Sequence, residues 1–153
     1  MSRSETVEKS LSDWQSSGPG PHVKTVDVPG GSVRFSANTV ESVGAKYHAI
    51  DVTRTDAPAV GEWAAQIASR AQGLREPLKV VEVDTTESVA TLRSAQPTTR
   101  SSTTGYYELV LSDGSEAQLQ RYEVERDLGS PRVAVPFALT HEATAEFVET
   151  IFG

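Results

Sequence analysis

Tyrosine and arginine side chains are concentrated between residues 106 and 122, and a further arginine precedes them in a polar stretch. We predict a ligand-binding group made of Tyr106, Arg121, Tyr122 and Arg100. Tyrosine and arginine are enriched at binding surfaces, and arginine holds anionic groups through paired hydrogen bonds. Ordinary packing of aromatic residues across two strands would explain the tyrosines without any ligand. The partner expected for this group is a protein or a small polar or anionic ligand.

The histidines form no recognisable catalytic or metal-binding motif. We expect His48 to share a strand face with Ile50 and Val52, which makes it the best ligand candidate among the histidines. A core histidine with satisfied hydrogen bonds is the competing interpretation. His141 has no second histidine four residues later, as a zinc-binding helix would require, and we expect it to be exposed in the first turn of a helix.

Carboxylate pairs and cofactor motifs give no stronger indication of catalysis. Glu123 and Glu125 would share one strand face, where solvent exposure explains them as well as a paired-acid site does. The sequence contains no nucleophile elbow, phosphate-binding loop, dinucleotide fingerprint or calcium loop. We therefore predict no catalytic residue, no metal site and no cofactor.

Two strands folded back on each other would position the tyrosines and arginines. The segment from Tyr106 to Arg126 alternates apolar and polar residues on both sides of a turn at Ser112–Gly114. Asp-Gly favours such a turn because glycine accepts a positive φ. A three-residue loop gathers the apolar residues on one face, and it predicts the pairs Leu111–Ser115, Leu109–Ala117 and Tyr107–Leu119.

The second half of this hairpin changes its apolar phase. Tyr122 and Val124 cannot share a face with Leu119 in a regular strand, so we predict a β-bulge near Gln120 and Arg121. The preceding stretch, Ala95 to Thr104, is polar, and we expect it to be a mobile loop that brings Arg100 close to Arg121.

Three helices and several strands are predicted around this hairpin. Ser2 and Glu5 fit a capping box, Asp56 would cap a helix that runs to Gln72 and ends at Gly73, and Thr140 would cap a closing helix. The remaining strands are expected at residues 23–28, 33–36, 46–54, 79–83, 88–93 and 132–137.

Composition and charge exclude several classes of protein. The chain has 153 residues, no cysteine and a net charge of −7, so it has no disulfide framework and is unsuited to general nucleic-acid binding. It lacks an apolar leader and any run of about 18 apolar residues that could span a membrane. We therefore expect an acidic, soluble, cytoplasmic protein, and a homodimer is one assembly that the sequence allows.

The order of the elements predicts an α+β fold: a twisted, mainly antiparallel sheet with two or three helices packed on it. We predict that residues 1–21 form an amphipathic helix and a Gly/Pro linker, and that residues 22–153 form a single domain. The helix either docks on this domain or serves as an arm for a partner. The layout is similar to that of Mog1/PsbP-like proteins, but without a shared motif this similarity implies no function or site residue.

These observations favour a non-catalytic binding or assembly module. One alternative is a small hydrolase or lyase-like enzyme whose site lies around His48 or the tyrosine–arginine group. Another is an accessory domain that docks on a larger complex through its N-terminal helix. A deep pocket lined by titratable residues would favour the enzyme, whereas an apolar surface repeated across a two-fold axis would favour assembly.

Overall fold

The computed structural model describes residues 1–18, 20–112, 115–126 and 130–153. Within these residues the chain forms three helices and ten strands, and the predicted α+β class is confirmed. Their bounds are α1 (Arg3–Asp13), β1 (His22–Val28), β2 (Gly31–Val40), β3 (Gly44–Arg54), α2 (Val60–Ala68), β4 (Leu78–Asp84), β5 (Val89–Ser94), β6 (Thr98–Arg100), β7 (Thr103–Ser112), β8 (Glu116–Glu125), β9 (Val133–Val135), β10 (Phe137–Thr140) and α3 (His141–Phe152).

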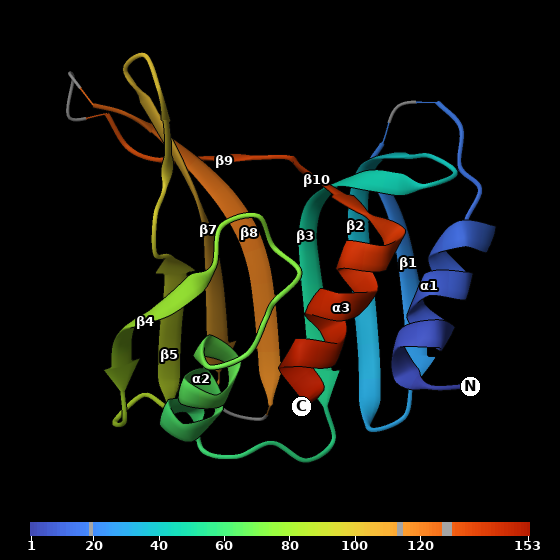
Figure 1. Ribbon diagram of the computed structural model, residues 1–153, viewed down its shortest axis with the longest axis horizontal. Helices are drawn as coiled ribbons and strands as arrows, with labels where there is room; N and C mark the ends of the chain where they lie inside the picture. Colours follow the sequence, from blue (N-terminus) through green and yellow to red (C-terminus); the bar gives the residue numbers. More distant parts are fainter. Residues whose placement is uncertain (19, 113–114, 127–129) are drawn as a thin grey trace.

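The strands form one antiparallel sheet in the order β1-β2-β3-β8-β7-β5-β4, and the helices lie in front of it (Figure 1). A single row of fully buried side chains crosses five neighbouring strands. The register links these residues in the order Phe35, Ile50, Leu119, Leu109 and Leu92. Because side chains alternate along a strand, the polar residues next to each of these on its own strand lie on the opposite, open face of the sheet.

The sheet divides between β3 and β8. These strands pair through Ile50–Thr53 and Glu116–Leu119, but beyond this point β3 pairs with β10 and β8 pairs with β9. Pro136 lies between β9 and β10. The single strand predicted over residues 132–137 is therefore wrong, because proline lacks the N–H that a continuous ladder needs.

The central hairpin is shifted by two residues from the predicted register. Leu109 pairs with Leu119 and Tyr107 pairs with Arg121, and the ladder continues up to Ser112 and Glu116. A shift of two keeps every side chain on its predicted face, so the apolar side of the hairpin is unchanged. The predicted turn residues Asp113 and Gly114 lie outside the described residues.

The β-bulge predicted near Gln120 and Arg121 is absent, since β7 and β8 pair without any register shift. A bulge lies instead in β3, where Ala49 pairs with Ser36 and Tyr47 pairs with Ala37, leaving His48 as the extra residue. This places both Tyr47 and Ile50 in the core, which a regular strand cannot do. His48 is exposed, so its predicted position beside Ile50 and Val52 is wrong.

The predicted mobile loop from Ala95 to Thr104 is also wrong. It folds into β6 and the first residues of β7, with Arg100 paired to Thr103 and Ser101 in a left-handed conformation at φ 53°. The threonines of this stretch favour strands because they are β-branched. Its polar composition therefore marks an exposed hairpin rather than disorder.

Helix α2 is shorter than predicted. Its N-cap is Ala59, without a side-chain hydrogen bond, so Asp56 does not cap it. It ends at Ala68, where the Ser69 hydroxyl donates to the carbonyl of Gln66 and turns the chain locally. Gly73 lies beyond the helix at φ 73°, and a Cβ there would be 2.8 Å from the Ala143 carbonyl of α3. Glycine thus permits close contact with α3 rather than ending α2.

Helices α1 and α3 have the predicted caps. Ser2 and Glu5 form a capping box, and the Thr140 hydroxyl accepts a hydrogen bond from the Ala143 amide. Val7 and Leu11 are fully buried, and α1 packs on α3 and β1, so its apolar face docks on its own chain. The independent folding of residues 22–153 remains a prediction.

Among the described residues, no helix is long and apolar enough to cross a membrane.

Candidate functional site

Arg121 occupies a position on the core face of the sheet. It follows Ala117 and Leu119 at the spacing that points all three side chains to the helix side, and it is 9% exposed. Its guanidinium forms two hydrogen bonds with Glu76, which is 4% exposed and lies between α2 and β4. The donor–acceptor distances are 3.2 Å from Nη1 to Oε1 and 3.0 Å from Nη2 to Oε2. A two-point contact of this kind fixes both side chains.

Neighbouring polar groups complete the network around Glu76. The hydroxyl of Ser94 donates to Oε1 of Glu76 at 2.7 Å, and Thr98 donates to Oε2. Ser94 in turn accepts a hydrogen bond from the Tyr107 amide, and the Arg121 guanidinium lies 4.7 Å from the centre of the Tyr107 ring. The buried carboxylate is therefore surrounded by donors on both oxygens, as a stable buried charge requires.

These contacts determine the ionisation of Glu76. Burial by itself would raise the pKa of this carboxyl, but hydrogen bonds from Arg121, Ser94 and Thr98 outweigh burial and hold the pKa below its ordinary value of 4.5. Glu76 is thus an anion at neutral pH, and its charge balances that of Arg121.

The depressed pKa predicts acid sensitivity. As pH falls below the ordinary carboxyl value of 4.5, the unfolded chain takes up a proton at Glu76 before the folded chain does. The contribution of Glu76 to the free energy of unfolding is therefore expected to be complete above that pH and to decline below it. Denaturant unfolding at a series of acidic pH values measures this decline. The free energy of unfolding should fall less steeply with decreasing pH in Glu76→Gln than in the unmodified protein. The same dependence on pH in both proteins would show that Glu76 is not the anion inferred here.

Two hollows are lined by both Arg75 and Arg121. One, of about 480 Å³, extends to the β6–β7 hairpin and includes Arg100 and Glu123. The other, of about 500 Å³, extends to β10 and includes Phe137. We refer to the two hollows together as the arginine groove.

The charges along the arginine groove are only partly balanced. Within the described residues, the side chains of Arg75 and Arg100 form no ion pair or hydrogen bond, whereas Arg121 is neutralised by Glu76. Glu123 is exposed and lines the same hollow as Arg100. The groove therefore presents two guanidinium groups without partners beside one carboxylate, an arrangement that favours an anionic guest.

The four predicted ligand-binding residues are divided between the two faces of the sheet. Arg100 and Arg121 line one hollow of the arginine groove. Tyr106 and Tyr122 pair with each other on the open face, where their ring centres are 6.1 Å apart. The prediction of a single group depended on a β-bulge at Arg121. This bulge is absent, so Arg121 and Tyr122 point to opposite faces of the sheet.

The two tyrosines belong to a separate ionic cluster. Arg132 lies 3.8 Å from the centre of the Tyr122 ring and binds Glu108 at 2.5 Å and 3.2 Å. Arg93 also donates to Glu108, at 2.8 Å, and covers the Tyr106 ring. Burial would raise the pKa of Glu108, but the hydrogen bonds from both arginines lower it overall. All charged groups of this cluster are paired, so it is suited to holding β9 against the sheet.

His141 is 3% exposed, and the predicted exposed position is wrong. The start of α3 lies under the β2–β3 connection, where the His141 amide donates to the Val43 carbonyl and Nε2 lies 2.9 Å from the Glu41 carbonyl. Among the described residues, no group of three or more histidine, aspartate or glutamate side chains could hold a metal ion.

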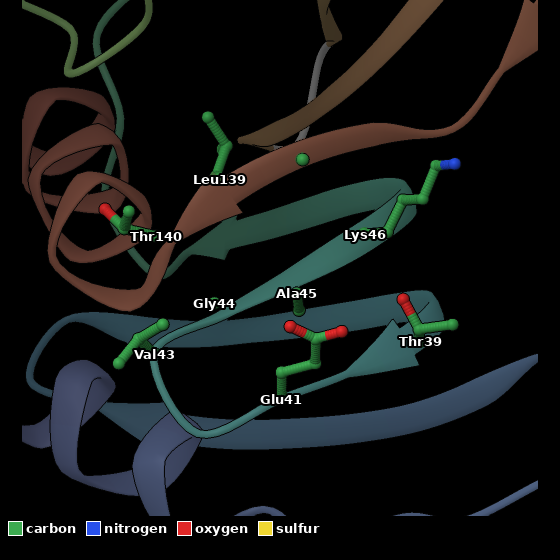
Figure 2. A pocket seen from close by; sticks show the side chains of 9 residues that line it. Thr39, Glu41, Val43, Gly44, Ala45, Lys46, Leu139 and Thr140 are labelled. Carbon is green, nitrogen blue, oxygen red and sulfur yellow. The ribbon is translucent and has the colours of Figure 1, made fainter.

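A further hollow lies between the β2–β3 connection and β10 (Figure 2). It has a volume of about 370 Å³, and its charged lining residues are Glu41 and Lys46. In Figure 2 the ammonium group of Lys46 points away from the Glu41 carboxylate. Because these groups do not converge, this hollow is a weaker candidate than the arginine groove.

No family model, curated protein or solved structure matches the chain. The functional conclusion therefore depends on the chemistry of the groove. Arginines from three separate segments, at 75, 100 and 121, line one hollow of the groove, and neither Arg75 nor Glu76 belongs to a pattern that the sequence could reveal.

Proposed function

We propose that this protein is a non-catalytic binding module that holds an anionic group of a partner or small ligand in the arginine groove. The observation that carries this proposal is that Arg75 and Arg100 lack ionic partners within the described residues, at a hollow whose third arginine is already neutralised. A carboxylate or phosphate would supply the missing charge and accept several guanidinium hydrogen bonds.

The Arg121–Glu76 pair supports binding by making the groove rigid. Both side chains are buried, and their hydrogen bonds hold one wall of the groove before a ligand arrives. Arg75 lies in the connection between α2 and β4 and Arg100 ends β6, so an anion with two charged ends would contact both. A prepared site loses less conformational entropy on binding than a mobile one.

The charge of the whole chain favours selectivity at this site. A net charge of −7 repels anions from most of the surface, whereas unpaired arginines attract them locally. Affinity for an anion should consequently fall as salt concentration rises, because ions in solution screen exposed charges.

Calorimetric titration with inorganic pyrophosphate at constant ionic strength tests this function. Arg100→Ala is expected to weaken binding roughly three- to tenfold, which corresponds to the loss of one exposed charge-assisted contact. Glu123→Gln is expected to strengthen binding, because it removes the negative charge that competes with the ligand in the same hollow. These two variants should change the dissociation constant in opposite directions.

Arg34→Ala provides the matched control. Arg34 is an exposed arginine of β2, opposite Asp51 on the open face, and its loss changes the net charge by the same amount as Arg100→Ala. We expect it to leave pyrophosphate binding nearly unchanged. Equal weakening by the two arginine variants would show that net charge, and not the groove, governs binding, and absence of binding to the unmodified protein would contradict the proposal.

A further inference from the structure

Strand β4 ends the sheet with an unusual number of exposed valines. Val80, Val81 and Val83 are 36%, 43% and 40% exposed. β4 pairs with β5 on one side, and no described strand pairs with its other side. Edge strands expose unpaired backbone N–H and C=O groups, and natural proteins often protect them with charges or bulges.

A bulge in β4 determines the faces of its charged residues. The register with β5 pairs Val80 with Leu92 and Glu82 with Thr91, which leaves Val81 as the extra residue. As a consequence, Lys79, Glu82 and Asp84 all lie on the open face, while Val80 and Val83 lie on the helix face. Without the bulge, Lys79 and Glu82 would lie on opposite faces.

This arrangement makes the edge of β4 complementary to itself. If a second β4 runs antiparallel alongside the first with the bulge at the two-fold axis, Lys79 of each copy lies opposite Glu82 of the other. The two-fold symmetry of the dimer produces this contact twice. Opposite charges at facing positions stabilise paired strands. The valines of the two copies meet beside these contacts.

The other edge strand lacks this property. In β1, Lys24 pairs with Phe35 on the helix face, whereas Asp27 pairs with Ser32 on the open face. Self-pairing of β1 could not bring these opposite charges together, and α1 packs against this strand. Substitutions in β1 therefore provide matched controls for substitutions in β4.

We propose that β4 is a self-association edge, through which two copies of this chain pair antiparallel to form one continuous sheet. The inference is independent of the arginine groove. A contact of one short strand from each copy is at the small end of specific interfaces, below about 1,200 Å² in total, so we expect a weak, concentration-dependent dimer.

Sedimentation velocity over a wide range of protein concentration tests the dimer. The unmodified chain should change from monomer to dimer as concentration rises. Lys79→Glu should weaken this association, because it places acidic residues against acidic residues, whereas the matched change Lys24→Glu on β1 should not. A chain that remains monomeric at every concentration would overturn the proposal, and so would a dimer that Lys79→Glu leaves unchanged.

Cysteine cross-linking tests the geometry, because the chain has no cysteine of its own. In this register the bulge at Val80 and Val81 lies on the two-fold axis, so the Cα atom of Val81 meets the same atom of the second copy at disulfide distance. Val81→Cys should therefore form a linked dimer under mild oxidation. Val23→Cys, an exposed valine of β1, should form much less, and equal linkage of the two variants would place the contact elsewhere.

Discussion

Replacing Glu76 with alanine is expected to lower the free energy of unfolding by about 3–5 kcal/mol, the usual cost of removing one partner of a buried ion pair. The loss arises because Arg121, at 9% exposure, would keep its charge with no carboxylate beside it. Ser94 and Thr98 would lose the acceptor of their hydrogen bonds as well. Equilibrium denaturation by urea, with an unchanged slope, would measure the difference.

A double variant separates the ion pair from simple loss of contacts. Glu76→Leu combined with Arg121→Met should be much more stable than Glu76→Ala, because it leaves no unpaired buried charge. Glu123→Ala, at an exposed carboxylate of the same groove, should change the free energy of unfolding by less than about 0.5 kcal/mol. If Glu76→Ala were as mild as Glu123→Ala, the pair would not be the structural support of the groove.

Trp63→Ala is expected to cost about 3–5 kcal/mol of stability, as large aromatic truncations in a core do. The indole is fully buried, and its Nε1 donates to the Ile151 carbonyl at 2.9 Å, which joins α2 to α3. Trp14→Ala is the natural comparison, because Trp14 is only half-buried at the end of α1. Denaturation midpoints measured by circular dichroism should fall much further for Trp63→Ala, and similar midpoints would contradict the packing of α2 described above.

The fold class could be predicted from sequence because its signals are local. Alternation along β7 and β8 marks two strands with one apolar face, and the hydroxyls of Ser2 and Thr140 mark helix starts. Each of these patterns follows from the geometry of its own segment. A register shift of two residues did not affect the core face, because strand side chains repeat every two positions.

The site was harder to predict because it depends on contacts between distant segments. The apolar phase of β8 ends at Arg121, which suggested a bulge, whereas the strand continues and its core face accepts an arginine paired with Glu76. Glu76 lies in a connection without periodicity, so no spacing links it to Arg121. The actual bulge at His48 follows from the need to bury both Tyr47 and Ile50, which becomes visible once the register with β2 is known.

The proposed function requires that Arg75 and Arg100 bind an anion while the ion pair of Arg121 with Glu76 stays intact. Heteronuclear NMR of the arginine Nε–Hε groups during a pyrophosphate titration tests this claim most directly. The signals of Arg75 and Arg100 should shift together along one saturable curve, with a smaller change at Arg121 and almost none at Arg34. Shifts of similar size at all four arginines, or shifts that do not saturate, would contradict it.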